Sequence, residues 1–388
     1  MNDDILLERE EVLGGLLNEL KNQKDWRIAR CKKFSLAEII FLVLCAQLCD
    51  FQSFRHYELY GKLKIDLLRI FLPYENGIPS RSTIARVLAI FNPEKFSNLF
   101  TQWMQRVVEK SVPNEQRKVI AIDGKSHNGV QEDSLHLVSA FDTQAGLTLG
   151  QEKVAEKSNE ITAIPLLLDS LAIAGHIVSI DAMGCQTAIA EKIRSKKADY
   201  FLAVKGNQGD LFQEFKDAFE NKKFLKTCNV VTRHDKGHGR LESRTCYASD
   251  KVDWISQESR WKDLKSMIMI ESKRTIKGKE SIERRFFISS ASADSEAFLT
   301  ASRSHWGIEN SLHWVLDVVF GEDDRVLWNK NIAHNESTIC KIALNLLKMY
   351  RLIRPTATPR SEKISIKGLR KVASLSDSEM IKILTGII

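Results

Sequence analysis

The sequence predicts an α/β protein in which an all-helical N-terminal domain precedes a mixed β-sheet with a β-rich insertion. Three observations support this prediction. Residues 1–112 have the patterning of helices. Apolar runs of strand length alternate with helical segments between residues 118 and 205, and a basic segment rich in hairpin signals follows at about 222–288. Helical periodicity resumes near Phe298.

The composition is typical of a folded protein and excludes a disordered chain. The protein has 388 residues, 43% of them hydrophobic, and a net charge of +7. Its longest predominantly apolar run, residues 39–49 with Gln47 inside it, is shorter than the ~20 residues that span a bilayer. The acidic start lacks the basic region of a signal peptide, so we expect a soluble cytoplasmic protein. The seven cysteines form no CxxC pair, which predicts neither a disulfide framework nor a zinc ribbon.

The N-terminal domain carries recognisable helix starts. Ser35 and Glu38 form the spacing of a capping box ahead of an apolar run. Residues 77–83 form a turn that leads into a helix carrying Arg81 and Arg86. Such a turn and helix could read DNA. An ordinary helical domain is the commoner explanation of this pattern, and the two interpretations stay open.

The next segment has the element order of a ribonuclease H-like sheet. Strands are predicted at residues 118–123, 135–142, 147–155, 176–181 and 200–205, and helices at 161–172 and 187–197. The order is therefore β-β-β-α-β-α-β. Three antiparallel strands followed by crossover helices place the first and fourth strands side by side.

Two acids end those neighbouring strands. Asp123 follows the first strand and Asp181 the fourth, so we expect both at one edge of the sheet. Neighbouring carboxylates repel each other unless a cation lies between them, and Mg²⁺ or Mn²⁺ prefers such oxygen ligands. Each Asp alone could instead belong to a strand-end turn or cap a helix. The candidates for a third carboxylate are Glu309, Asp317, Glu322, Asp323 and Asp324.

One helical stretch also places two histidines beside an acid. His305, Glu309 and His313 follow one another at intervals of four, so they share a helix face. Zinc is disfavoured, because zinc-protease helices have their two histidines four apart. Trp306 and Trp314 are expected in the core.

The positive charge is local. Residues 222–285 hold 17 Lys and Arg against 9 Asp and Glu. This excess suits a polyanion such as nucleic acid. A solvated, lysine-rich sheet face is an equally good explanation from charge alone.

Four motifs in order closely resemble those of bacterial insertion-sequence transposases of the H-repeat-associated (Rhs-linked) group, which have a DDE catalytic core. The motifs occupy residues 120–125, 179–186, 203–208 and 305–314. The resemblance covers nearly the whole chain, and residues 77–80 lie in a region similar to that group's transposase-associated domain. It implies a transposase-associated, DNA-binding domain at 1–112, a DDE domain at 113–350 with the insertion at about 222–288, and a linker with a short helix at 351–388.

The resemblance implies the catalytic residues and the partners. Asp123, Asp181 and Glu309 match the three acids of the triad, which would hold Mg²⁺ or Mn²⁺ and catalyse DNA cleavage and strand transfer. The implied partners are the terminal inverted repeats of the element and target DNA. No membrane is implied, and a homo-oligomer on DNA is allowed.

The resemblance also implies DNA contacts in the basic insertion, at Lys236, Arg240 and Arg244. Lys125 and Lys205 lie next to the acids and could neutralise phosphate charge. A salt bridge at the rim is the alternative for each.

The surroundings of the third acid depart from a common pattern. Many insertion-sequence transposases have Tyr, Arg and Lys around this Glu where this chain has Ser302, His305 and Leu316. His305 would replace the Arg as a phosphate donor. The departure leaves the cleavage pathway, including hairpin formation, open.

Two other functions remain as alternatives. The chain could be a catalytically silent, co-opted DNA-binding protein derived from a transposase, although three intact acids favour activity. It could also be another ribonuclease H-fold nuclease, which the long basic insertion disfavours.

Overall fold

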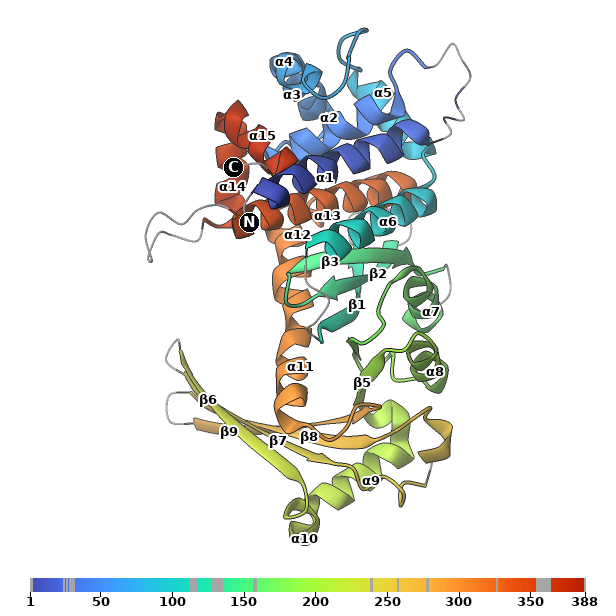
Figure 1. Ribbon diagram of the computed structural model, residues 1–388, viewed down its shortest axis with the longest axis vertical. Helices are drawn as coiled ribbons and strands as arrows, with labels where there is room; N and C mark the ends of the chain where they lie inside the picture. Colours follow the sequence, from blue (N-terminus) through green and yellow to red (C-terminus); the bar gives the residue numbers. More distant parts are fainter. Residues whose placement is uncertain are drawn as a thin grey trace.

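Nine strands form one continuous mixed sheet beneath a layer of helices in the computed structural model of this chain (Figure 1). The structure describes residues 3–23, 25, 27, 32–111, 117–127, 135–155, 159–237, 240–256, 258–276, 279–325, 327–353 and 364–386. The predicted mixed α/β class with a helical N-terminal region is confirmed. Within the described residues, no helix is long and apolar enough to cross a membrane.

The helical layer is built from both ends of the chain. Its members are α1 (Asp3–Asn22), α2 (Leu36–Leu48), α3 (Phe54–Leu63), α4 (Ile65–Arg69), α5 (Arg81–Ile90), α6 (Pro93–Ser111), α13 (Lys330–Ile353), α14 (Ile366–Leu375) and α15 (Asp377–Thr385). The predicted capping box starts α2: Ser35 Oγ accepts from the backbone N–H of Glu38 at 3.1 Å. Every residue of α2 is buried, so this helix forms the centre of the layer.

The C-terminal segment has more structure than predicted. Two helices, α14 and α15, take the place of the expected single short helix, and they share one core with the N-terminal helices. Arg370 on α14 donates to the carbonyl of Gln47 at 2.8 Å, and Lys64 pairs with Asp377 at 2.7 Å. The predicted linker falls largely on residues 354–363, outside the described residues. The division of the chain at residues 112 and 350 stays a prediction.

The sheet begins with the predicted five strands. The nine strands are β1 (Val119–His127), β2 (Leu135–Asp142), β3 (Leu147–Lys153), β4 (Ile177–Ile180), β5 (Asp199–Val204), β6 (Asn229–Gly237), β7 (Arg240–Ser249), β8 (Ser266–Ile276) and β9 (Lys279–Ser289). Their order is β3-β2-β1-β4-β5-β9-β8-β7-β6. β1 is antiparallel to β2 and parallel to β4, so the ribonuclease H-like arrangement is confirmed.

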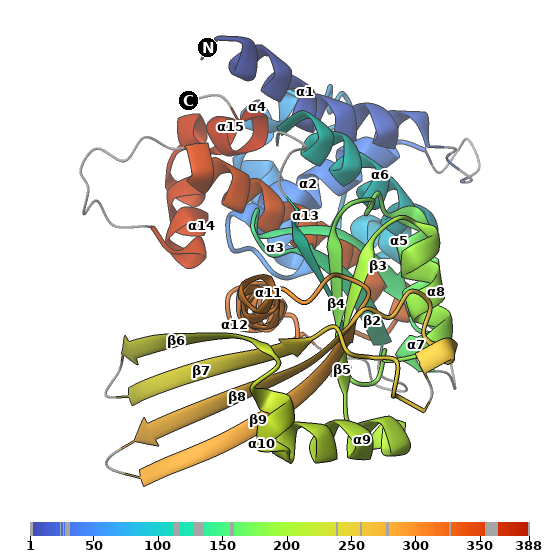
Figure 2. The same cartoon turned by 60° about the horizontal axis from the view of Figure 1, so that its bottom comes forward.

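The β-rich insertion is part of the same sheet. Its strands β6 to β9 form an antiparallel meander, and β9 pairs with β5 from Phe201↔Ser289 to Val204↔Phe286. In Figure 2 the meander extends away from the first five strands as a blade, with α9 (Gly209–Glu220) and the short α10 (Lys222–Leu225) at its base. The N-terminal part of β9 is exposed along its length, so both faces of the blade's outer end meet solvent.

Helices cover the two faces of the first five strands. α7 (Glu160–Ser170) and α8 (Thr187–Ser195) pack on the face formed by Ile120, Ile122, Val178 and Ile180. α11 (Ser295–Ile308) packs on the opposite face, near Val119 and Ile177. It continues into a π-helix (Glu309–His313) and then α12 (Trp314–Val318). Because side chains alternate along a strand, Asp123 and Asp181 belong to the face that α11 covers.

Candidate active site

Asp123 and Asp181 are neighbours, but only Asp181 stands at a strand end. The prediction that the first strand ends at Asp123 is wrong, because β1 continues to His127 in its pairing with β2. Ile122 and Ile180 are partners in the parallel ladder of β1 and β4, and Asp123 and Asp181 are the next residue on each strand. The turn after β4 orients Asp181, whose Oδ1 accepts from the backbone N–H of Met183 at 3.0 Å and of Gly184 at 3.3 Å. The structure therefore brings these two predicted site residues together at one sheet edge.

The third acid of the predicted triad comes from the helix on the same face. Glu309 is exposed and opens the π-helix between α11 and α12. Short π-helical turns recur at functional sites. His305 fastens this helix to β4, because its Nδ1 lies 3.0 Å from Ser179 Oγ. The predicted phosphate donor His305 is thus mostly buried against the sheet, where it helps to hold Glu309 near the other acids.

Asp123 is buried and is influenced by the charges of other carboxylates. Burial first, and then the charges of Glu160, Asp181 and Glu309, raise the pKa of Asp123 to about 7. A divalent cation would relieve this repulsion, and carboxylate oxygens are the ligands that Mg²⁺ prefers. In the described residues, no three His, Cys, Asp or Glu side chains converge closely enough to hold a metal ion. The chemistry of the donor set fits a hard cation.

His313 lies beside Asp123. Its Nδ1 is 3.5 Å from Asp123 Oδ2. Burial lowers the pKa of His313 to about 3, so the ring is neutral at physiological pH. His305 binds Ser179 while Glu309 faces solvent, so the three groups of the expected His-Glu-His face point to different partners.

Glu160 is an acid whose charge acts on Asp123 and which the sequence interpretation did not single out. It is the first residue of α7, and its Oε1 lies 2.7 Å from His136 Nε2. Among the charges that raise the pKa of Asp123, Glu160 ranks ahead of Asp181. The sequence feature that could have drawn attention to Glu160 is its place directly after the helix N-cap Asn159, in the connection between β3 and β4. An acid at this position usually stabilises the helix N-terminus through its charge, so the sequence pattern did not indicate any other role for Glu160.

Lys125 forms salt bridges with a cluster of three acids. Its Nζ lies 2.7 Å from Asp317 Oδ1, 3.1 Å from Asp323 Oδ1 and 3.6 Å from Glu322 Oε2. Burial alone would lower the pKa of Lys125, but these carboxylates raise it above its ordinary value. The structure thus shows the salt-bridge alternative around Lys125, and its contact with DNA stays a prediction. Three of the candidate third acids are bound to this lysine.

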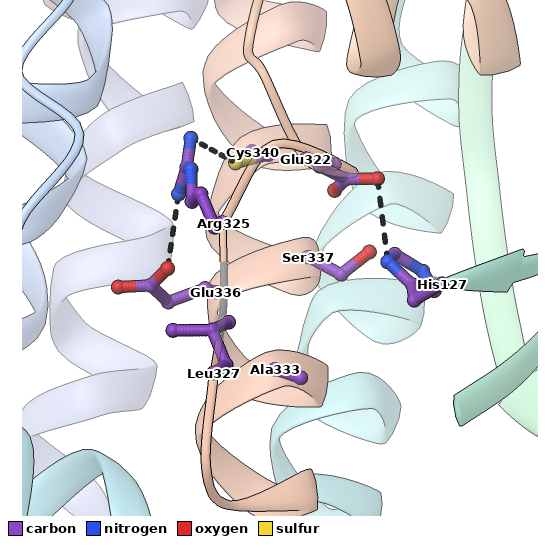
Figure 3. Close-up of a pocket in the computed structure, with 8 residues that line it drawn as sticks. All are labelled: His127, Glu322, Arg325, Leu327, Ala333, Glu336, Ser337 and Cys340. Carbon is purple, nitrogen blue, oxygen red and sulfur yellow. Dashed lines mark hydrogen bonds and ion pairs between the residues drawn. The ribbon is translucent and has the colours of Figure 1, made fainter. Parts of the chain in front are cut away.

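A polar cavity lies next to that cluster, between β1 and α13 (Figure 3). It measures about 10 Å³, room for about one water molecule. His127 Nδ1 is 3.7 Å from Glu322 Oε2, and Arg325 donates to Glu336 Oε2 at 2.9 Å. Both carboxylate oxygens of Glu322 are buried without a hydrogen bond in the described part of the chain. A bridging water is the physical solution for such a group, so we assign this cavity a structural role.

The motif after β5 braces the loop that carries Asp181. Asn207 donates to the carbonyl of Ala182 at 2.6 Å, and Gln208 donates to the carbonyl of Cys185 at 2.6 Å. Neither side chain makes a capping hydrogen bond to the following helix. Lys205 is exposed at the end of β5, on the same sheet edge as the acids.

The predicted DNA contacts of the insertion lie on the meander, away from Asp123 and Asp181. Lys236 is exposed near the end of β6. Arg244 on β7 pairs with Glu242 at 2.8 Å and lies 3.8 Å from Asp235. Arg240 begins β7, and its side chain lies outside the described part of the structure.

The prediction that two tryptophans are buried is wrong. Trp306 is 41% exposed and Trp314 is 56% exposed. The buried stripe of this segment consists of Ile308, Leu312 and Leu316, so the tryptophans fall on the solvent side. The Arg285 guanidinium lies 4.9 Å from the ring centre of Trp306, which links α11 to β9.

Comparisons with known proteins match most of the chain. The family described as "Transposase DDE domain" matches residues 110–346, and the family described as "DDE_Tnp_1-associated" matches residues 17–104. "H repeat-associated putative transposase YhhI" of Escherichia coli (strain K12) is 40% identical over 348 residues, which cover 86% of this chain and 90% of the relative. "Putative transposase YncI" of Escherichia coli O157:H7 is 38% identical over 344 residues, which cover 86% and 87%.

One comparison concerns a solved structure, a piggyBac transposase synaptic complex with hairpin DNA. It aligns with a TM-score of 0.44 and 9% sequence identity, over 97% of this chain and 81% of that chain.

Proposed function

This chain belongs to the family of transposases with a DDE domain, and from that premise we propose that it binds the ends of an insertion sequence and catalyses DNA cleavage and strand transfer. The observation that supports this proposal is the adjacency of Asp123 and Asp181 on β1 and after β4. The charges of Asp181 and Glu309 contribute to raising the pKa of Asp123 to about 7. The proposed substrates are the terminal inverted repeats and target DNA. The proposed location is the cytoplasm, and copies of the chain would pair when two element ends are joined.

The proposed cofactor is Mg²⁺, with Mn²⁺ as a substitute. Asp123, Asp181 and Glu309 would hold it, since hard oxygen ligands and close negative charges are what such a cation requires. A bound Mg²⁺ supplies Lewis-acid stabilisation of the charge that builds up on the phosphodiester oxygens.

The protein's own residues position the DNA for two successive reactions. In the first, water attacks a phosphodiester at the element end, and the broken P–O bond leaves a free 3′-hydroxyl. In the second, that hydroxyl attacks a phosphodiester of the target DNA and displaces one of its oxygens. The hydrogen bonds from Asn207 and Gln208 hold the Asp181 loop during both steps. No covalent bond between protein and DNA is required.

Cationic and aromatic groups would bind the DNA on either side of the acids. Lys205 is exposed at the sheet edge, and Lys236, Arg240 and Arg244 lie on the meander. Lysine and arginine contacts to phosphates set the position of a duplex without reading its sequence. Trp314, exposed beside the π-helix, offers a flat face for stacking a base.

A cleavage assay tests the proposal. The full chain would be incubated with a duplex carrying its own flanking element end, in Mg²⁺, in Mn²⁺ or in EDTA. We expect metal-dependent cutting at the element end that is lost in Asp123→Ala. The control Asp253→Asn changes an exposed acid in the turn after β7 and should cut normally.

The other outcomes favour the alternative functions. Binding without cutting in either metal would make the chain a silent, co-opted DNA-binding protein. Cutting without preference for the element end would make it a ribonuclease H-fold nuclease of another kind.

A further inference from the structure

Glu160 lies with its carboxylate against Gly124, the residue after Asp123, on the face of the sheet opposite to α11. It opens α7, which packs on the face away from α11, and Asn159 caps that helix by accepting from the backbone N–H of Ile161 at 3.2 Å. The side chain of Glu160 is only 13% exposed. After burial, its charge is the strongest influence that raises the pKa of Asp123.

The residue after Asp123 leaves space for this carboxylate. Gly124 follows Asp123 on β1 and belongs by alternation to the face that α7 covers. A Cβ atom at position 124 would overlap the Glu160 carboxylate and would lie 2.6 Å from His136 Nε2. Contacts this short would force the Glu160 and His136 side chains to move, so glycine at position 124 is what allows the Glu160 carboxylate to lie against β1 there.

A hydrogen-bonded pair on the first two strands holds the carboxylate in place. His136 Nε2 lies 2.7 Å from Glu160 Oε1, and His136 Nδ1 lies 2.7 Å from Ser126 Oγ. Ser126 and His136 are partners in the antiparallel ladder of β1 and β2, so the sheet register fixes this pair. Among the described residues, Oε1 of Glu160 takes this hydrogen bond and Oε2 takes none.

We propose that Glu160 is a fourth carboxylate of the active site, which binds the divalent cation together with Asp123, and that His136 is its positioning residue. The inference rests on the proposed function, because it adds a ligand to the same cation. Metal-binding carboxylates are themselves held by hydrogen bonds, and losing such a partner costs about 10- to 100-fold in metal affinity. A purely structural Glu160 would only stabilise the start of α7, with no dependence on metal.

Metal binding to the full chain tests this inference without relying on activity. Mn²⁺ would be titrated above the raised pKa of Asp123, and free Mn²⁺ would be followed by electron paramagnetic resonance, with Tm recorded in parallel. We expect Glu160→Gln to raise the half-saturating Mn²⁺ concentration at least about tenfold, and Glu160→Asp to recover part of the loss. Glu191→Gln, which removes the same charge from an exposed position on α8, should bind as the wild type does.

Two further variants separate positioning from folding. His136→Ala should weaken Mn²⁺ binding by about 10- to 100-fold, and His136→Gln, which keeps an N–H donor, should recover part of it. Gly124→Ala should act in the same direction without touching any ligand, because the added methyl displaces the Glu160 carboxylate. Gly124→Ala therefore decides the question if Glu160→Gln proves too unstable to purify.

The outcomes distinguish this inference from the proposed function. Wild-type binding by Glu160→Gln, with binding lost in Asp123→Asn, would overturn the role of Glu160 and leave the transposase proposal intact. Failure of the wild-type chain both to bind Mn²⁺ and to cut an element end would overturn both. An equal loss in Glu191→Gln would trace the effect to net charge and would also overturn the inference.

Discussion

Replacing Asp123 with asparagine should stabilise the metal-free protein above neutral pH. In the folded chain, burial and the neighbouring carboxylates raise the pKa of Asp123 from 3.8 to about 7. The folded state therefore holds this proton more tightly than the unfolded state. Its favourable contribution is complete below pH 3.8 and is lost as the pH rises through about 7. A pKa difference of about three, at about 1.4 kcal/mol for each pH unit, amounts to about 4 kcal/mol.

Asparagine has nearly the same shape as aspartate and never ionises, so the substitution removes the unfavourable free energy of a buried negative charge at position 123. The free energy of unfolding of Asp123→Asn should exceed that of the wild type by about 4 kcal/mol at high pH and by little near pH 4. Urea unfolding in EDTA over a pH series measures the difference. Asp253→Asn, at an exposed turn, should show no such trend. A difference that stays constant or shrinks as the pH rises would refute the electrostatic account of Asp123.

Four further predictions concern groups around the acids. Trp314→Ala should weaken binding to DNA by about 1–3 kcal/mol in a gel-shift titration. Its Tm should be unchanged because the side chain is 56% exposed, and a large fall in Tm would contradict its surface role. Lys125→Met should destabilise the protein by about 3–5 kcal/mol in urea, since it leaves the buried Glu322 and the partly exposed Asp317 without their cation. Lys205→Met should keep full stability and lower the salt dependence of DNA binding by about one phosphate contact, and equal effects of the two lysine changes would count against this distinction. Asn207→Ala should cost about 1 kcal/mol of stability and slow cleavage at least tenfold, whereas cleavage at the wild-type rate would show that the Asp181 loop needs no brace.

The two faces of the sheet differ in the side chains that they carry near the acids. One face packs against α7 and α8 through aliphatic side chains, and the other carries the acids beneath α11. Packing of the apolar face stabilises the folded state and offsets the unfavourable repulsion among the carboxylates. Such repulsion is the expected cost of a site prepared for a cation.

Local patterns in the sequence were sufficient for the fold class and for the positions of the first two acids. Each apolar run between residues 118 and 205 became a strand or helix within a few residues of its expected ends. Asp123 and Asp181 are neighbours because the strand order alone pairs β1 with β4. The family membership expected from the four motifs is confirmed, while the roles of the individual residues stay predictions.

Several features depended on contacts between distant segments. The charge around Lys125 is decided by acids almost two hundred residues later in the chain. Glu160 lies beside Gly124 and His136 because the glycine leaves room for it and the β1–β2 register places His136 there. Trp314 is exposed because other residues of the same helical segment fill the core.

The sequence by itself determined where the chain forms strands and helices, and that Asp181 stands at a strand end, because hydrophobic periodicity and turn chemistry act over a few neighbouring residues. Only the tertiary structure decided which charges face each other, since that depends on strand register and on the crossing of helices from distant parts of the chain. A carboxylate such as Glu160 looks the same in the sequence whether it caps a helix or completes an active site.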